Sequence, residues 1–393
     1  MRSSKKATAL PGGPWGSIRN VRVLCVGNGG LIRREGRLCS HPFIGDFLRQ
    51  LGDLVGEVCF CSWLDASDDP LSRTSLESIA GVRALGLPPF RGPLPRKLVN
   101  GLFSLAMVTR EVFRADFVYL YWPGRLSGMA ARLCRLWQRP YGVYLRGELV
   151  QSEREFASAL GRSRFTLAAG EALKASAAAY CQDVETVTPM NSVRSEHVVS
   201  PRVPRNSGRW NLLYVGRIEE RKGVRDLLAA AAYLEEWGLP FVLTMIGHCP
   251  DVPGFLSPSS SSVARHVRLV EPVSEFEKLI PYYAAADAFV FPSHDEGFPR
   301  VLYEAMALGV PIITTFVGSI SGVMEDRKNC LRIEVRNPRD IAEKVRQLIA
   351  NPTLQSQLAW AGHDCITRLM RTWQRPHALQ VAERLSELQR NWS

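Results

Sequence analysis

The stretch AFVFPSHDEGFPRVLYEAMALGVPIITT, from Ala288 to Thr315, indicates the fold of this chain. It opens with the apolar run AFVFPS, which is typical of a buried strand, and it closes with a second such run, PIITT. Between them, PRVLYEAMALG has apolar residues at helical spacing and ends at Gly309, where a helix commonly stops. A buried strand, a helix and a second buried strand form the repeating unit of a parallel sheet.

The same alternation runs through most of the 393 residues, so we predict an α/β protein with doubly wound, Rossmann-like sheets. The polar, proline-containing segment Ser200 to Arg209 separates two series of alternating strands and helices. We therefore expect two lobes facing a cleft, with ligands at the carboxyl ends of the strands. The expected order is a loose tail (1–18), an N-terminal domain (19–203), a C-terminal domain (204–372) and a helix packing back on the first domain (373–393).

Composition is that of a globular protein, with 46% hydrophobic and 22% charged residues. The net charge of +11 is uneven: residues 1–200 hold 26 basic and 17 acidic residues, and residues 201–393 hold 23 and 21. Such asymmetry indicates either an anionic partner, such as a membrane surface or a lipid phosphate, or a bias toward arginine, which supplies 41 of the 49 basic residues. No nucleic-acid-binding motif accompanies the charge, so nucleic acid is not an expected partner.

No segment predicts a membrane-spanning helix or a metal site. The apolar run Leu98 to Val108 is about half the length that a spanning helix needs. The nine cysteines form no CxxC pair, which favours scattered thiols in a reducing cytosol. The aspartates of DASDD (65–69) resemble a metal-binding pattern, but a solvated loop is the preferred interpretation. We expect no metal and no cofactor.

The segment YVGRIEERKG places two cations directly after a predicted strand. Gly216 ends the strand, and Arg217 and Lys222 follow within a tight loop. Two cations beside a glycine at a strand's carboxyl end are suited to neutralising a diphosphate. The alternative is that both are solvated loop charges balanced by the neighbouring glutamates.

The helix predicted to begin at Pro299 supplies the other half of the candidate site. Its amino end carries unpaired N–H groups and a positive dipole that favour phosphate. Glu304 lies one to two turns further on, beyond Leu302, and its side chain leans back toward a ribose hydroxyl. Glu296, in the loop ahead of the helix, is placed to accept hydrogen bonds from the hydroxyls of a sugar. A buried carboxylate such as Glu304 is costly unless it has a partner.

These motifs together resemble the donor site of glycosyltransferase family 4. The resemblance rests on Gly-Arg followed by Lys-Gly, and on Pro-Ser-x-x-Glu-Gly-Phe-Pro with a second Glu eight residues after the first. It covers most of Trp210 to Pro352, including VRLVEPVSEFEKLIPYYAAADAFVFPS, and weakens over the first domain. The resemblance implies a GT-B fold and a retaining transferase that uses a nucleotide-diphosphate sugar as its donor substrate.

The resemblance also implies residue roles. Arg217 and Lys222 would hold the diphosphate and Glu304 the ribose, in agreement with the reasoning from the residues. Glu296 would hold the sugar, and we name Arg217, Lys222 and Glu296 as the catalytic residues.

Backbone groups complete the expected donor site. The N–H groups of Gly297 and Phe298, at the start of the helix that includes Pro299 and Leu302, would contact the sugar. Gly29 and Gly30 would form a glycine turn of the first domain, although an ordinary tight turn is an equal alternative.

Two positions depart from the family pattern. Arg146 to Glu148 stand where members often have a histidine at the end of a first-domain strand, which leaves the acceptor side open. Gly247 is followed by His248 and Cys249, where a Gly-x-Gly loop is common. His294 is close enough in sequence to touch the sugar, but a structural hydrogen bond is its preferred role.

The predicted function is sugar transfer with retention to a hydroxyl of a glycan or lipid-linked acceptor, in cell-surface polysaccharide or glycolipid biosynthesis. The alternatives are a sugar-nucleotide 2-epimerase of the same fold and a non-catalytic nucleotide-sugar-binding partner. The expected location is the cytoplasm, including peripheral contact with the anionic inner face of a membrane.

Overall fold

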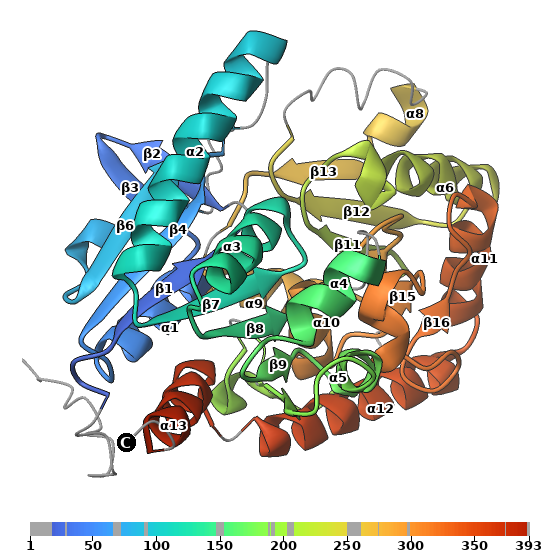
Figure 1. Cartoon of the computed structure of the whole chain (residues 1–393). Coiled ribbons are helices and arrows are strands. Elements are labelled where there is room, and N and C mark those ends of the chain that lie inside the picture. Colours follow the sequence, from blue (N-terminus) through green and yellow to red (C-terminus); the bar gives the residue numbers. More distant parts are fainter. Residues whose placement is uncertain are drawn as a thin grey trace, which may run out of the picture.

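The computed structural model contains two parallel sheets, each covered by helices on both faces (Figure 1). The residues that the structure describes are 18–27, 30–65, 72–89, 93–146, 153–187, 189, 193–202, 208–249, 261–273, 275–296, 299–373 and 375–390.

The first sheet is built by the N-terminal half of the chain. Its strand order in the described part is β10-β9-β8-β7-β1-β4-β6, and every pairing is parallel. β1 lies between β7 and β4, so the connections run outward from it in both directions, as in a doubly wound fold. The strands are β1 (Arg22–Val26), β4 (Glu57–Trp63), β6 (Val82–Leu87), β7 (Phe117–Trp122), β8 (Tyr141–Leu145), β9 (Thr166–Ala168) and β10 (Val184–Thr186).

Helices cover this sheet because its central strands are apolar on both sides. All six residues of β7 are buried, which is typical of a parallel strand between two helical layers. The covering helices are α1 (Pro42–Gly52), α2 (Leu94–Arg114), α3 (Arg125–Leu136), α4 (Glu153–Leu160) and α5 (Glu171–Ala178).

A small antiparallel sheet follows β1 and was not predicted from the sequence. It pairs β2 (Leu31–Arg34), β3 (Arg37–Ser40) and β5 (Thr74–Ser75). The β2–β3 loop has only two residues, Glu35 and Gly36, and both have positive φ (49° and 81°). Such a loop suits a tight hairpin, so the Glu-Gly pair between short apolar runs was the available signal.

The second sheet has the same architecture. Its order in the described part is β13-β12-β11-β14-β15-β16, again parallel throughout, with the first strand, β11, between β12 and β14. The point at which the winding reverses therefore lies between β11 and β14. The strands are β11 (Trp210–Val215), β12 (Phe241–Ile246), β13 (Val267–Val270), β14 (Ala288–Phe291), β15 (Ile312–Thr314) and β16 (Leu331–Arg332).

The helices of the second half surround this sheet and then return to the first. Its helices are α6 (Val224–Glu236), α8 (Ser261–Ala264), α9 (Phe276–Ala285), α10 (Arg300–Ala307), α11 (Pro338–Ile349), α12 (Pro352–Thr372) and α13 (His377–Arg390). Four short 3₁₀ helices join elements among the described residues: η2 (Leu76–Ser78), η3 (Ser195–His197), η4 (Glu220–Lys222) and η5 (Gly318–Gly322).

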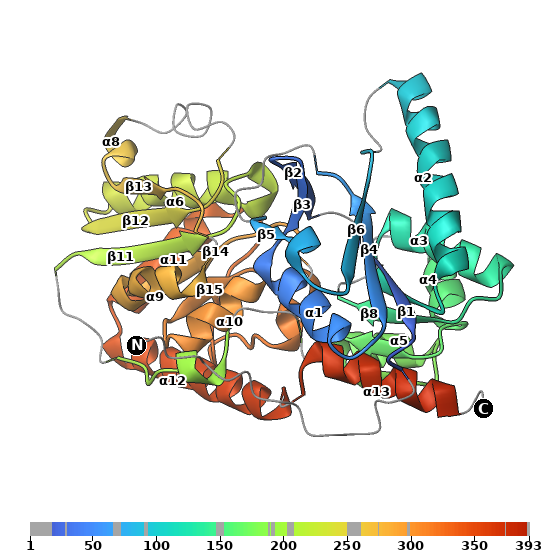
Figure 2. The same ribbon diagram turned by 90° about the vertical axis from the view of Figure 1, so that its left-hand side faces the viewer.

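The last helix, α13, lies beside α1 of the first lobe (Figure 2). His377 packs edge-on against Phe47 of α1, with ring centroids 4.9 Å apart, and its Nε2 lies 2.8 Å from the hydroxyl of Tyr119. Gln380 donates to the carbonyl of Thr186 at 3.3 Å. The two lobes are therefore joined by α13 as well as by the segment that links the two sheets.

Three expectations from the sequence concern the tail, the cysteines and membrane-spanning helices. The expected tail lies outside the described residues, except that Ile18 is fully buried and thus belongs to the packed first lobe. All nine cysteines are described, and each is a free thiol. Among the described residues, no helix combines the length and apolarity needed to cross a bilayer.

Candidate functional site

The loop after β11 lies at the carboxyl edge of the second sheet, where the winding reverses. In an open parallel sheet this is the usual position of a ligand. Gly216 leads into the loop, and the hydroxyl of Tyr214 donates to the carbonyl of Arg217 at 2.7 Å. Gly247, which follows β12, packs so closely that a Cβ there would lie 1.8 Å from the carbonyl oxygen of Gly216. Only glycine at 247 allows this approach.

A second glycine brings the β11 loop against the β14 loop. Gly223 has φ +68°, and a Cβ on it would lie 1.9 Å from the carbonyl oxygen of Pro292. Lys222, the last residue of η4, precedes it and is thereby held beside the residues that follow β14. Glycine after Lys222 is therefore required for the close approach of the two loops, and this approach places Lys222 beside the β14 loop.

The β14 loop is fixed by hydrogen bonds on both sides. The hydroxyl of Thr315 donates to the carbonyl of Ser293 at 2.6 Å, and the backbone N–H of His294 donates to the carbonyl of Arg221 at 3.0 Å. Ser293 in turn donates from Oγ to Oε1 of Glu296 at 3.0 Å. Glu296 is thus oriented by a side chain of its own loop.

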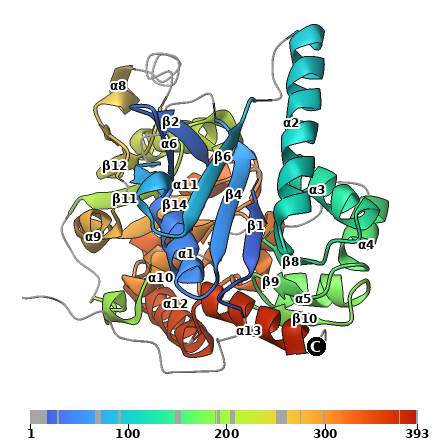
Figure 3. The ribbon, with the colours of Figure 1, turned by 60° about the vertical axis from the view of Figure 1, so that its left-hand side comes forward.

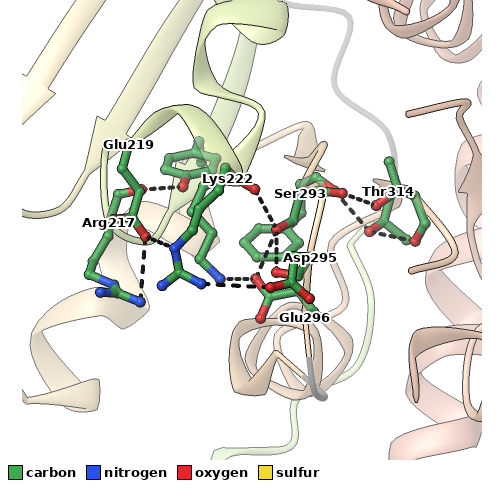
Figure 4. A network of polar contacts seen from close by, with 11 residues as sticks. Arg217, Glu219, Lys222, Ser293, Asp295, Glu296 and Thr314 are labelled. Carbon is green, nitrogen blue, oxygen red and sulfur yellow. Dashed lines mark hydrogen bonds and ion pairs between the residues drawn. The ribbon is translucent and has the colours of Figure 1, made fainter. Parts of the chain in front are cut away.

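Lys222 and Glu296 form an ion pair at the centre of this arrangement (Figure 4). Nζ of Lys222 donates to Oε1 of Glu296, and the two side chains are only 11% and 12% exposed. A nearly buried charge is costly without a counter-charge. Each side chain therefore offsets the cost of burying the charge of the other.

Arg217 lies at the exposed side of the same network, also visible in Figure 4. Its Nη2 is 3.4 Å from Oε1 of Glu219, which also accepts from Arg221 at 2.8 Å. Arg221 approaches Asp295 of the β14 loop at 4.0 Å. Exposed ion pairs of this kind contribute little to stability. Arg217, whose side chain is 55% exposed, is therefore able to leave Glu219 and turn toward a bound anion.

Glu304 lies apart from this network, inside α10. It is 7% exposed, and its Oε2 accepts a hydrogen bond from the hydroxyl of Tyr283 in α9 at 2.9 Å. Burial raises the pKa of Glu304, while the Tyr283 hydrogen bond and the charge of Arg300 act in the opposite direction. Burial, assisted by Glu304, raises the pKa of Tyr283 well above its usual range. Tyr283 is the partner that the sequence analysis required for Glu304 and did not identify.

The remaining predicted site residues are placed as follows. Pro299 is the N-cap of α10 rather than its first residue, and Leu302 is fully buried, so its side chain belongs to the core. Gly30 has φ +76° and lies near His41 at the first lobe's edge. Outside the described residues lie Gly29, Gly297, Phe298, Gly147, Glu148, Asp68 and Asp69.

The first lobe meets α10 through a contact that the sequence analysis did not identify. The guanidinium carbon of Arg300 lies 3.6 Å from the ring centroid of Phe43, and burial lowers the pKa of Arg300. Arg146, at the end of β8, lies 5.7 Å from the ring centroid of Tyr121. Phe43 and Arg300 are 257 positions apart, so no local pattern pairs them.

His294 has a structural partner. Its Nε2 lies 2.6 Å from Oδ2 of Asp226 in α6, and both side chains are largely buried. This contact agrees with the structural hydrogen bond that was the preferred interpretation of the residue. It fixes the β14 loop to α6.

The two lobes and their winding define the GT-B fold, and solved structures of that kind superpose over almost the whole chain. Sucrose-phosphate synthase from Thermosynechococcus elongatus covers 95% of this chain and 99% of its own, with a TM-score of 0.67 and 16% identity. HepE of Anabaena in complex with UDP-glucose covers 95% and 100%, with a TM-score of 0.65 and 14% identity.

A family model matches within the second half of the chain. Residues 199–363 match the family "Glycosyl transferases group 1". The D-inositol 3-phosphate glycosyltransferase of Nocardiopsis dassonvillei is 32% identical over 173 residues, which are 42% of this chain and 40% of that protein. The glycogen synthase of Mycobacterium tuberculosis is 31% identical over 167 residues, again 42% and 40%. The matched region thus spans about two fifths of each curated relative.

Proposed function

We propose that this protein is a retaining glycosyltransferase of family 4 that moves a sugar from a nucleotide-diphosphate sugar to an acceptor hydroxyl. The observation that carries the proposal is the convergence of Arg217, Lys222 and Glu296 at the carboxyl edge of the second sheet. The match of residues 199–363 to group 1 glycosyl transferases and the GT-B fold of the whole chain support it. HepE, which shares the fold, was solved with UDP-glucose.

The proposed donor lies with its diphosphate beside Arg217 and Lys222 and its ribose toward Glu304. The ammonium of Lys222 has three N–H donors, so it is able to keep Glu296 while donating to a phosphate oxygen. Glu296, oriented by Ser293, accepts from the hydroxyls of the transferred sugar. Backbone groups of Gly297, Phe298 and the Gly29–Gly30 turn complete the proposed contacts.

The proposed chemistry is stabilisation of the leaving group. Negative charge grows on the departing phosphate as the bond to the sugar breaks, and preorganised cations lower the free energy of that transition state. Arg217 and Lys222 supply this charge, so the proposal involves no metal ion. The acceptor attacks from the face that the phosphate leaves, which retains the configuration at the anomeric carbon.

The acceptor is proposed to be a glycan or a lipid-linked hydroxyl that approaches from the first lobe, in cell-surface polysaccharide or glycolipid synthesis at the cytoplasmic face of a membrane. Arg146, at the carboxyl end of β8, places a cation on that side. The cation suits an acceptor that carries a phosphate or a carboxylate.

The test is a panel of nucleotide sugars with different bases and sugars. A true donor raises the melting temperature of the protein by mass action. That donor is then incubated with the protein and candidate glycan or lipid acceptors, and the anomeric configuration of the product is read by NMR. Donor binding followed by transfer with retention supports the proposal, whereas an inverted product refutes the assigned mechanism.

The same incubation without acceptor separates the rival functions. Interconversion of two nucleotide sugars would identify an epimerase, and donor binding without turnover on any acceptor would identify a binding partner. Stabilisation by no nucleotide sugar at all would refute the proposed site.

A further inference from the structure

Helix α2 presents apolar side chains to solvent along almost its whole length. Helices on the surface of a globular protein normally turn their apolar side inward and their polar side outward. In α2 the arrangement is inverted over the amino-terminal half. We refer to the following six exposed residues as the α2 face: Leu94, Leu98, Val99, Leu102, Phe103 and Leu105.

Helical periodicity makes the α2 face continuous. Leu94, Leu98, Leu102 and Leu105 follow one another at intervals of four, four and three residues, so they form a single stripe. The first three are 70%, 60% and 68% exposed. In this half of the helix the less exposed side is the polar one, with Lys97, Asn100 and buried Ser104. The apolar stripe is buried only toward the carboxyl end, at Val108 and Val112.

The amino-terminal half of α2 projects beyond the body of the first lobe (Figure 3). A helix of 21 residues is about 31 Å long, whereas the seven residues of β4 extend about 23 Å. Because α2 follows β6 and runs antiparallel to it, the projecting end lies at the carboxyl edge of the sheet. This is the edge at which the acceptor is proposed to bind.

Aromatic residues continue the exposed apolar surface at the other end of α2. Phe113 is 58% exposed and stacks edge-on against Trp137, with centroids 6.0 Å apart. Leu136 beside it is 71% exposed, and Arg139 lies 5.2 Å from the centroid of Phe113. Tryptophan and arginine in this combination are enriched where protein meets the polar–apolar boundary of a lipid bilayer.

Charge around the α2 face has one sign. Residues 94–146 contain nine basic and two acidic side chains, a net charge of +7 out of +11 for the chain. Both acids are already paired, Glu111 with Arg83 and Asp116 with Arg22. Arg96, Arg110 and Arg114 are exposed along one flank of the apolar stripe.

We propose that the α2 face, with Phe113, Leu136 and Trp137, docks the protein on an anionic lipid membrane. An apolar stripe flanked by arginine is suited to lying in the plane of the headgroups, where the leucines enter the acyl boundary and the cations meet lipid phosphates. A second copy of the chain fits less well, because contact between two α2 faces would bring like charges together. Docked in this way, α2 runs along the membrane, and its amino end keeps the carboxyl edge of the first sheet beside the membrane surface.

The test is flotation of the full-length protein with vesicles, in the absence of any sugar donor, so that the result does not depend on the proposed transfer activity. Vesicles of phosphatidylcholine alone are compared with vesicles containing 30% phosphatidylglycerol. We expect binding to the anionic vesicles, and we expect half-molar salt to weaken it strongly because surface charges are then screened. Hydrogen exchange should slow in residues 94–105 when these vesicles are added.

Two variants test the two components of the α2 face. Leu98→Gln/Leu102→Gln removes apolar surface without changing the charge, and Arg96→Gln/Arg110→Gln removes charge without changing the stripe. Each should lower the partition coefficient about ten-fold or more. Their melting temperatures should equal that of the unmodified protein, because all four side chains project into solvent or lie at the surface.

The matched control is Val199→Gln/Val335→Gln, which removes two exposed aliphatic side chains far along the chain from α2. It should bind vesicles as the unmodified protein does. Failure of the unmodified protein to bind anionic vesicles, or equal binding by the Leu98→Gln/Leu102→Gln variant, would overturn the proposal. So would sedimentation that shows a dimer abolished by that variant, since the α2 face would then be an interface between copies.

Discussion

Variants of the ion pair between Lys222 and Glu296 are expected to affect the stability of the protein and its binding of the donor differently. Replacing Lys222 with Met leaves the carboxylate of Glu296, whose side chain is 12% exposed, with Ser293 as its remaining described partner. Removing one partner of a buried pair typically costs about 3–5 kcal/mol. Since the Ser293 hydrogen bond remains, we expect a loss of about 2–4 kcal/mol. For a domain of this size that is a fall in melting temperature of roughly 5–15 °C.

The double variant Lys222→Met/Glu296→Gln is the informative comparison. It leaves no uncompensated charge, so most of the lost stability should return. Donor-induced stabilisation should nevertheless be absent from both variants, because the cation and the carboxylate proposed to bind the donor are gone. Thermal unfolding by circular dichroism, with and without the donor found in the panel, measures both quantities.

The control is Lys278→Met, which removes a lysine from an exposed pair with Glu275 at 2.8 Å. It should change stability by less than about 0.5 kcal/mol. The reasoning is refuted if Lys222→Met melts like the unmodified protein, or if the double variant is less stable than the single one. Donor stabilisation that persists in the double variant would remove both residues from the proposed site.

Three further predictions follow from the geometry. Arg217→Ala should lower kcat about 10²- to 10³-fold, as loss of one preorganised charge does elsewhere, with little change in melting temperature because the side chain is 55% exposed; an unchanged rate would exclude it from the mechanism. Gly223→Ala and Gly238→Ala both place a side chain at a φ near +67°, a strain of about 1–2 kcal/mol, but only at Gly223 does the new Cβ meet a carbonyl oxygen, at 1.9 Å. Urea unfolding should therefore show a much larger loss for Gly223→Ala, and equal losses would contradict the close approach. Burial raises the pKa of Glu304 from 4.5, so the folded protein binds more protons than the unfolded chain and should lose stability as pH rises from about 4.5 through the folded pKa. Glu304→Gln, which keeps an acceptor for Tyr283, should abolish that slope in urea titrations at successive pH values; a slope that persists in the variant would assign it to another group.

Local sequence determined the elements of the fold. Strands and helices with clear apolar periodicity, such as β11, β14 and α10, were visible in the sequence, whereas β6, β9 and β10 were not identified. The expectation that Arg217, Lys222 and Glu296 lie at one edge also followed from the sequence, because the carboxyl ends of parallel strands share an edge. The sequence indicated a turn at Gly223, but it did not indicate that this turn packs against the β14 loop.

Only the tertiary structure decided the contacts between distant segments. The partner of Glu304 is Tyr283 in another helix, Phe43 meets Arg300 across the two lobes, and α13 packs on α1. The sequence also showed the apolar run Leu98 to Val108 without showing which of its side chains are covered. Burial is a property of the assembled chain: periodicity fixes which residues share a face, and only the packing of neighbouring elements determines whether that face is inside or exposed.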